Sequence, residues 1–347
     1  MVNNPTGITG FDFIEFSSQQ PEKLHELFLK LGFSRLKKHK AKKIDYYRQN
    51  DIHFLINSEP NSFAAHFTTA HGPCASATGW RVKNAAEARK IAIERGATPA
   101  ERSDYSKANG DALEAIQGVG QSLIYFVDFY QAQDRWEQLG FVDLEKPDLR
   151  PSKGFALVDH LTNNVYKGAL LPLANFYKNV FGFVDIRYFD IRGEQTGLTS
   201  YALRSPCGSF CIPINEGSEA KSQINEYLNE YKGEGIQHIA LLTSDMLKVM
   251  AQMQVEGLKT LDIDADYYEE AFKRVPQLKE DKAEIQKYNL LVDGDESGYL
   301  IQIFTENLIG PIFFEFIQRH NNLGFGEGNF SALFRAIERD QKRRGVL

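Results

Sequence analysis

The chain has 347 residues, of which 42% are hydrophobic and 25% charged, and its formal net charge at pH 7 is −6. This length suits about two domains, and the acidic balance argues against a nucleic-acid-binding protein, which would carry a basic face. The first residues lack the charged segment followed by an apolar one that is typical of a signal peptide, and no apolar run reaches the roughly 18 residues of a membrane span. The three cysteines are too few for a disulfide framework. We therefore expect a soluble, cytoplasmic protein.

Residues 10–33 and residues 79–97 share one supersecondary pattern. Each segment has a strand, a polar turn, an amphipathic helix and a closing glycine. In the first copy Leu24, Leu27, Phe28 and Leu31 fall three and four residues apart, as they do on one face of a helix. Segments rich in β-branched and aromatic residues follow the helices and predict short strands. They are IDYYRQ (44–49), IHFLINS (52–58), DALEAIQ (111–117) and SLIYFVD (122–128).

The segment 144–154, LEKPDLRPSKG, contains two prolines and several charges and has no apolar periodicity. Such a composition is typical of a linker. It predicts two domains, residues 1–150 and 151–347.

The unit recurs in the second half, at residues 154–183 and 235–258. The pattern is thus βαβββ, four times, with two units in each half. This arrangement is typical of the vicinal-oxygen-chelate superfamily, an α+β fold in which each pair of units forms an open, curled sheet or half-barrel around a central cavity. We expect that fold here.

The last strand of the fourth unit, PIFFEFIQ (311–318), places Glu315 among aromatic residues. An unpaired buried carboxylate costs several kcal/mol, so it must be paired, protonated or bound to a metal. His160 and His238 lie in the first strands of the third and fourth units, at matching places. Three strands of one curled sheet would turn these side chains toward a common interior.

Two imidazoles and one carboxylate form the ligand set of non-haem Fe(II) oxygenases, which leaves three coordination positions open. Zinc hydrolases use similar donors, so the residues alone leave the metal undecided. Each histidine could instead be a hydrogen-bonded core residue. His320, in a polar segment, is expected at the surface.

The first half lacks these ligands at the corresponding places. Aligning its strands with those of the second half sets Glu15 opposite His160 and Tyr125 opposite Glu315, and the place of His238 falls near Thr78. We expect the first half to keep the shape without a metal site, and to serve a structural or oligomerisation role.

Several segments, the longest of which is the C-terminal block from FFEFIQRHNN onward, resemble the bacterial 4-hydroxyphenylpyruvate dioxygenase family across essentially the whole chain. The others are DHLTNNV, PINE, KSQINEYL, GEGIQHIALLT and GYLIQIFT. The resemblance implies conversion of 4-hydroxyphenylpyruvate and O₂ to homogentisate and CO₂, in tyrosine and phenylalanine catabolism. It implies Fe(II) held by His160, His238 and Glu315, and a homo-oligomer, a dimer or tetramer.

The resemblance also implies a substrate pocket. It assigns polar catalytic contacts to Ser200, Asn215, Gln223 and Gln302. It assigns substrate contacts to Pro213, Gln237, Phe304, Phe313, Phe325, Asn329 and Phe330. On a regular strand Gln237 would face away from His238, so its role requires a twist or a bulge. Many family members have a second histidine where this chain has Asn164, in a predicted turn; this change could alter contacts around the ligands.

The segment 324–347 predicts a glycine-rich hinge, GFGEG, followed by a helix capped by Asn329. Phe330, Leu333, Phe334 and Ile337 form its apolar stripe. We expect this helix to close the cavity mouth; the alternative is a helix that only stabilises the fold.

Two other functions remain open. A 4-hydroxymandelate synthase would use the same iron site and substrate but oxygenate the benzylic carbon. A protein of the same fold could also bind a ligand without catalysis, although the three ligand residues argue against this.

Overall fold

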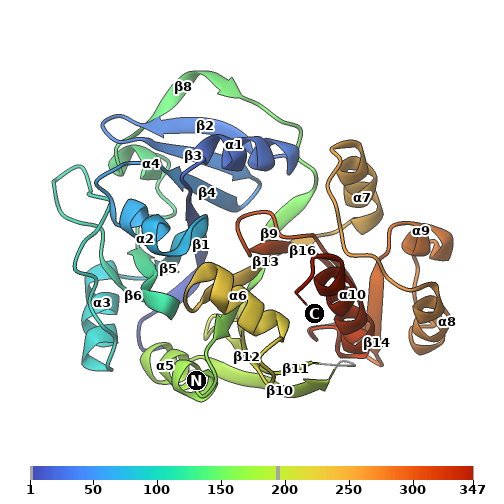
Figure 1. Cartoon of the computed structure of the whole chain (residues 1–347). Helices are drawn as coiled ribbons and strands as arrows, with labels where there is room; N and C mark the ends of the chain where they lie inside the picture. Colours follow the sequence, from blue (N-terminus) through green and yellow to red (C-terminus); the bar gives the residue numbers. More distant parts are fainter. Residues whose placement is uncertain (1–2, 193–195, 347) are drawn as a thin grey trace.

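The chain folds into two sheets, one from each half (Figure 1). The structure, a computed structural model, describes residues 3–192 and 196–346. The first sheet consists of β1 (Ile8–Ser17), β2 (Ser34–His39), β3 (Ile44–Gln49), β4 (Ile52–Asn57), β5 (Cys74–Val82), β6 (Ala115–Gln117), β7 (Leu123–Val127) and β8 (Phe141–Asp148). The second consists of β9 (Phe155–Val165), β10 (Val184–Arg192), β11 (Gly197–Arg204), β12 (Cys211–Gly217), β13 (Gly235–Thr243), β14 (Leu291–Asp295), β15 (Gly298–Phe304) and β16 (Phe313–His320).

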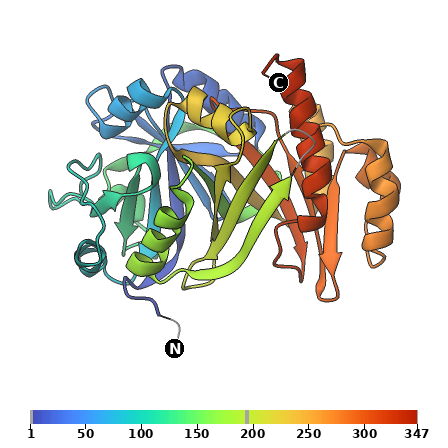
Figure 2. The same cartoon turned by 60° about the horizontal axis from the view of Figure 1, so that its bottom comes forward.

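The two sheets have closely related strand orders. These are β6-β7-β5-β1-β4-β3-β2-β8 and β10-β11-β12-β9-β13-β16-β15-β14. In each, the first strands of the two units lie side by side, β1 beside β5 and β9 beside β13, as antiparallel pairs. The predicted α+β fold of two curled sheets is confirmed, and both curved sheets are visible in Figure 2.

Helices cover the faces and edges of the sheets. In the first half they are α1 (Pro21–Lys30), α2 (Phe63–His71), α3 (Ala85–Glu94) and α4 (Arg135–Gln138). In the second they are α5 (Leu170–Phe176), α6 (Gln223–Tyr231), α7 (Met246–Val255), α8 (Ala265–Arg274), α9 (Lys282–Lys287) and α10 (Phe330–Arg343). None of the helices in the described ranges is long and apolar enough to cross a membrane.

Local sequence explains where these helices begin. Pro21 opens α1, where its missing N–H costs nothing, and Leu24 and Phe28 are buried beneath it. The side chains of Asn84 and Asp245 accept hydrogen bonds from the backbone N–H three residues on, at the starts of α3 and α7.

The second unit departs from the predicted pattern, because its last strand, β8, does not pair with the other strands of that unit. β8 crosses to the far edge of the sheet and pairs with β2. The predicted linker 144–154 was therefore wrong at its beginning, since residues up to Asp148 belong to β8. The strand is mostly exposed, charged and contains Pro147, as suits a sheet edge.

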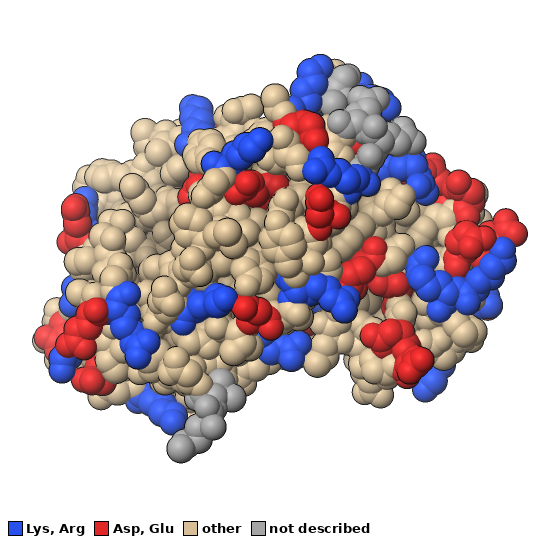
Figure 3. All heavy atoms as spheres, turned by 90° about the horizontal axis from the view of Figure 1, so that it is seen from below, with Lys and Arg blue, Asp and Glu red and all other residues tan. Residues whose placement is uncertain are grey.

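The two halves share one hydrophobic core. Phe54 of β4 packs against Phe314 of β16, with ring centroids 6.3 Å apart, and Trp80 of β5 lies 4.8 Å from Phe181. Acidic and basic side chains are interspersed over the face shown in Figure 3. All three cysteines are free.

Candidate metal centre

His160, His238 and Glu315 come from three neighbouring strands, β9, β13 and β16. Ala240 of β13 is the cross-strand partner of both His160 and Glu315, and its small side chain leaves the space between them open. One donor atom from each of the three side chains lies within 4.8 Å of the others. His160 Nε2 is 3.0 Å from Glu315 Oε2, and His238 Nε2 is 3.4 Å from the same oxygen.

Two β-bulges orient the histidines. Asp159 is the extra residue on β9 between Val158 and His160, and Gln237 is the extra residue on β13 between Ile236 and His238. Because a bulge turns its residue toward the face of its neighbour, each side chain reaches the adjacent imidazole. His160 Nδ1 donates to Asp159 Oδ2 at 2.7 Å, and His238 Nδ1 donates to Gln237 Oε1 at 3.0 Å.

The bulge at Gln237 is the departure from a regular strand that its predicted pocket role requires. A regular strand would point its side chain away from the cavity, whereas here it lines the cavity beside His238.

Burial and charge shift the pKa values of the three groups. Burial lowers the pKa of His160, but Glu315 and Asp159 outweigh it and raise this pKa to about 9. Burial raises the pKa of Glu315, but the two histidines, His160 foremost, lower it to about 2. Burial lowers the pKa of His238 against the opposing effect of Glu315. Glu315 is therefore a carboxylate at neutral pH.

The donor set fits a divalent transition-metal ion. With both Nδ1 atoms engaged, each imidazole presents Nε2 toward the carboxylate, which is the arrangement that outer partners impose on metal-bound histidine. Two donors about 2.1 Å from one ion, and at right angles around it, lie about 3 Å apart. The separations of 3.0 and 3.4 Å between the nitrogens and Glu315 Oε2 match that spacing.

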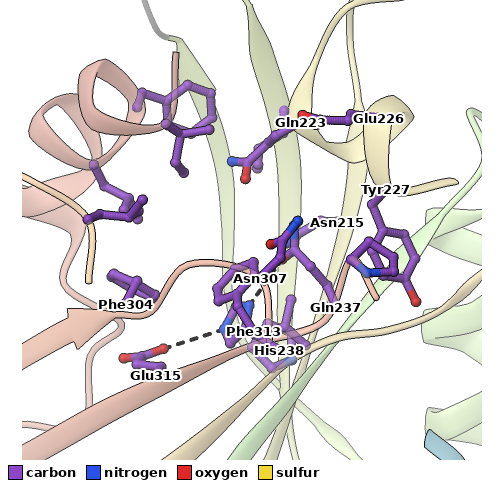
Figure 4. A pocket seen from close by; sticks show the side chains of 18 of the residues that line it. Asn215, Gln223, Glu226, Tyr227, Gln237, His238, Phe304, Asn307, Phe313 and Glu315 are labelled. Atoms are coloured by element: carbon purple, nitrogen blue, oxygen red, sulfur yellow. Dashed lines mark hydrogen bonds and ion pairs between the residues drawn. The ribbon is translucent and has the colours of Figure 1, made fainter. Parts of the chain in front are cut away.

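His238 and Glu315 lie at one end of a cavity of about 140 Å³ (Figure 4), and His160 also lines this cavity. Rings surround them: Phe313 stacks on His238 at 4.9 Å, and Phe325 meets His160 edge-on at 5.5 Å. Gln223 reaches in from α6 (Figure 4). Of the predicted pocket residues, the cavity lining includes Ser200, Pro213, Asn215, Gln223, Gln237, Phe304, Phe313, Phe325 and Phe330.

Two predicted pocket residues lie outside this lining. Gln302 is buried on β15, on the same face as Phe304, and its amide has no hydrogen-bond partner among the described residues. Asn329 is also buried, but its Oδ1 accepts from Tyr267 and Arg274. Asn329 does occupy the N-cap position of α10, as predicted, but its side chain makes no capping hydrogen bond to the helix.

Two further predictions about single residues were wrong. Asn164 lies within β9 and not in a turn; it is fully buried, and no described residue hydrogen-bonds its amide. His320 is half-buried at the end of β16, where its ring stacks on Tyr299 and its Nε2 lies 2.9 Å from Glu280. The polar neighbours of His320 in sequence gave no sign of these long-range partners.

Several residues of the cavity were not predicted from the sequence. Thr162 Oγ1 lies 2.9 Å from His238 Nε2. Glu226 and Tyr227 follow Gln223 by three and four residues on α6, a helical spacing that could have identified them. Phe189 and Leu261 come from segments without a signal of this kind.

The strand registers identify the counterparts in the first half. Phe16 pairs with Ala75 and Glu15 with Ala77, which leaves Ser76 as the bulge residue. Counting from this bulge sets Ala77 at the place of His238 and Phe13 at the place of His160. The expected pairing of Glu15 with His160 was therefore wrong, because local sequence similarity does not reveal the strand register. Ala77 adjoins Thr78, near which the place of His238 was expected.

Tyr125 does correspond to Glu315, as predicted. Tyr125 pairs with Gly79, as Glu315 pairs with Ala240. Phe13, Tyr125 and Tyr105 pack together here, with ring centroids 5.3 to 6.1 Å apart. Aromatic rings thus fill the space that holds donors in the second half. Among the described residues, His160, His238 and Glu315 are the one cluster with metal-ligand geometry.

Comparisons with known proteins agree with this geometry. A family model described as hydroxyphenylpyruvate dioxygenase, N-terminal, matches residues 2–145. A second, of the glyoxalase/bleomycin resistance protein/dioxygenase superfamily, matches residues 157–303.

Relatives match over nearly the whole length. Protein MelA of Shewanella colwelliana is 52% identical over 99% of both chains. The 4-hydroxyphenylpyruvate dioxygenase of Legionella pneumophila is 45% identical over 99% of this chain and 98% of its own. The structure of a mutant 4-hydroxymandelate synthase from Streptomyces coelicolor superposes with a TM-score of 0.82 over 98% of this chain and 100% of that chain. Its sequence identity of 20% supports the fold alone.

Proposed function

The chain belongs to the 4-hydroxyphenylpyruvate dioxygenase family and is an enzyme of that family, and from this premise we propose how its residues perform the reaction. We propose that His160, His238 and Glu315 bind Fe(II), and that the cavity above them accepts 4-hydroxyphenylpyruvate and O₂ to give homogentisate and CO₂. One observation carries the proposal: three buried donors from sister strands converge at the end of an aromatic cavity.

The donor set leaves room for the reactants. His160, His238 and Glu315 would hold the ion from one side only, which would leave its other side open to the cavity. When bound, Fe(II) supplies the oxidative chemistry that amino-acid side chains cannot perform. The protein's task is to bind, orient and shield the substrate.

The aromatic walls suit the substrate ring. Phe304, Phe313 and Phe325 each pack against a ligand histidine, with centroid distances of 4.9 to 6.0 Å. A ring held among them would lie close to the donors, because aromatic pairs favour such separations. The amides of Asn215, Gln223 and Gln237 offer hydrogen bonds that would fix the polar ends of the substrate.

The C-terminal helix covers the cavity. The stripe of Phe330, Leu333, Phe334 and Ile337 on α10 lines it, and Figure 2 shows α10 lying against the second sheet. Arg344 near the end of α10 pairs with Glu226 of α6, and Arg339 pairs with Asp264. We propose that this helix excludes water during the reaction.

The first half, by contrast, serves as a scaffold in this proposal. Its corresponding strands carry Phe13, Ala77 and Tyr125 in place of the ligands, and its core is continuous with that of the second half. The expected dimer or tetramer remains part of the proposal.

Product identification tests the function. The protein is loaded with Fe(II) under anaerobic conditions, 4-hydroxyphenylpyruvate and O₂ are added, and the products are separated and identified. We expect homogentisate, with one O₂ consumed and one CO₂ released per turnover. Hydroxymandelate would contradict the proposed ring hydroxylation, and absence of O₂ uptake would contradict catalysis altogether.

A further inference from the structure

Arg319 occupies an unusual position at the end of β16, four residues after Glu315. Its side chain is 13% exposed and makes hydrogen bonds in two directions. Nε and Nη2 each donate to one oxygen of Asp159 at 2.8 Å. Nη1 donates to the backbone carbonyls of Asn322 at 3.1 Å and Gly324 at 2.7 Å. A mostly buried charge is thus held by a bidentate partner and by a loop.

One end of this arrangement reaches the metal centre. Asp159 Oδ2, which accepts from Arg319, also accepts from His160 Nδ1 at 2.7 Å. A carboxylate in this position fixes both the tautomer and the orientation of a metal-binding imidazole. Arg319 in turn fixes the carboxylate, because two parallel hydrogen bonds define its plane.

The other end reaches the segment that leads to the C-terminal helix. Residues 321–326, which we name the hinge loop, connect β16 to the short turn before α10. Phe325 in this loop lines the cavity, meets the His160 ring edge-on, and lies 6.0 Å from the Arg319 guanidinium. The loop therefore contacts the metal ligand directly and through Arg319.

We propose that Arg319 is a positioning residue that couples His160 to the hinge loop, so that metal binding and ordering of the loop favour each other. A guanidinium is planar and rigid, so a shift of Asp159 changes the geometry offered to both loop carbonyls. Such coupling is reciprocal: if the ordered loop favours metal binding, the metal must order the loop. The inference rests on the proposed metal site.

The first half contains a bulge carboxylate at the place of Asp159, but the residue after it is not a metal-ligand type. Asp12 is the extra residue on β1 between Phe11 and Phe13, as Asp159 is on β9. It pairs with Arg81 at 3.0 Å and with Arg135 at 2.5 Å. Its neighbour Phe13 offers no nitrogen. A bulge carboxylate that pairs with arginine therefore occurs in both halves, although Arg81 of β5 and Arg135 of α4 do not occupy the place of Arg319. The contacts to an imidazole and to a hinge loop occur in the second half.

The first experiment measures metal affinity. Co(II) binding to the full-length protein is followed by competition with a chelator and by the visible spectrum of the bound ion. We expect Asp159→Asn and Arg319→Lys to weaken Co(II) binding by about 10- to 100-fold, and to change the spectrum. The matched variant Asp12→Asn should bind Co(II) within about twofold of the wild type.

The second experiment measures the coupling. Hydrogen exchange of residues 321–326 is compared with and without saturating Co(II). We expect Co(II) to slow this exchange at least about fivefold in the wild type and in Asp12→Asn, and to leave it nearly unchanged in Arg319→Lys and Asp159→Asn. Exchange in β5 reports whether each variant is folded; if one variant does not fold, the other gives both measurements.

The outcomes separate the two proposals. If the wild type does not bind Co(II) at all, the proposed metal site is wrong. If it binds Co(II) but the folded variants keep wild-type affinity, or keep the metal-dependent slowing, then Arg319 does not couple the two sites.

Discussion

Three side chains distinguish the two halves of this chain at the point where a metal could bind. At equivalent positions in the strand register, one half has His160, His238 and Glu315, and the other has Phe13, Ala77 and Tyr125. The bulges are present in both halves, so the backbone does not make the difference. The difference lies in the chemistry of the side chains at these three positions.

Removal of the Glu315 carboxylate, a proposed metal ligand, should weaken metal binding strongly. Glu315→Gln removes the charge that lies 3.0 and 3.4 Å from the two Nε2 atoms. We expect Fe(II) affinity to fall about 100-fold or more, and turnover to fall with it. Isothermal titration under anaerobic conditions measures the affinity. The register-matched Tyr125→Phe should retain wild-type affinity; equal losses in both variants would contradict the assignment.

Glu15 should make stability depend on pH. Burial, with the added charge of Asp104, raises its pKa from 4.5 to about 7 against hydrogen bonds from Tyr105, Ser76 and Asn57. Between those values the folded protein holds a proton that the unfolded chain releases, so the free energy of unfolding falls as pH rises. The loss is complete above pH 7 and amounts to about 3 kcal/mol.

Glu15→Gln should abolish this dependence, because it has no proton to lose in that window. Relative to the wild type, its free energy of unfolding should rise by about 3 kcal/mol between pH 4.5 and pH 8. Urea denaturation at several pH values measures the difference. The exposed Glu94→Gln should show no such trend, and a constant difference for Glu15→Gln would refute the explanation.

At the scale of elements, bulges and small residues decide what each strand presents. The bulges at Asp159 and Gln237 place two successive side chains on the cavity face, so that each histidine has its hydrogen-bond partner beside it. Opposite His160 stands Ala240, and opposite Phe13 stands Gly79. The ring in the first half needs the space that a side chain would take.

Gly79→Ala should therefore destabilise the first sheet. A Cβ at this position would lie 2.3 Å from the Phe13 ring, which is itself packed among other rings and cannot move freely. We expect a loss of about 1–3 kcal/mol in the free energy of unfolding. Gly10→Ala in β1 is the control, since its nearest neighbour would lie 3.4 Å away. Thermal and urea unfolding compare the two; similar losses would disprove the steric explanation.

At the scale of the whole molecule, the two halves are joined by more than the connecting segment. Gln49 at the end of β3 accepts hydrogen bonds through Oε1 from the backbone N–H of Lys153, Gly154 and Phe155, and its Nε2 donates to Leu31. This side chain fixes the path of the chain from one sheet to the next. The shared core then predicts that both halves unfold together.

Gln49→Leu should weaken that junction. The substitution removes the Gln49 acceptor of the Lys153 and Phe155 backbone donors, and we expect the free energy of unfolding to fall by about 1–3 kcal/mol in a single transition. Calorimetry would detect a second transition if the halves became independent. The exposed Gln254→Leu should change stability by less than about 0.5 kcal/mol.

Local sequence patterns predicted much of the fold. The repeated unit and the strands at 44–49 and 52–58 follow from local periodicity, which a few neighbouring residues determine. The placement of Glu315 among aromatic residues and the matching positions of two histidines predicted the candidate metal centre, because burying such groups without partners is costly.

Tertiary structure decided the contacts between residues far apart in sequence. The equivalence of Phe13 and His160, the path of β8, and the environments of Asn329 and His320 depend on strand register and on packing across the molecule. The link from His160 through Asp159 and Arg319 to the hinge loop joins residues up to 160 positions apart. The sequence determines which donor side chains are present. The distances between their donor atoms are set only when β9, β13 and β16 pair within one sheet.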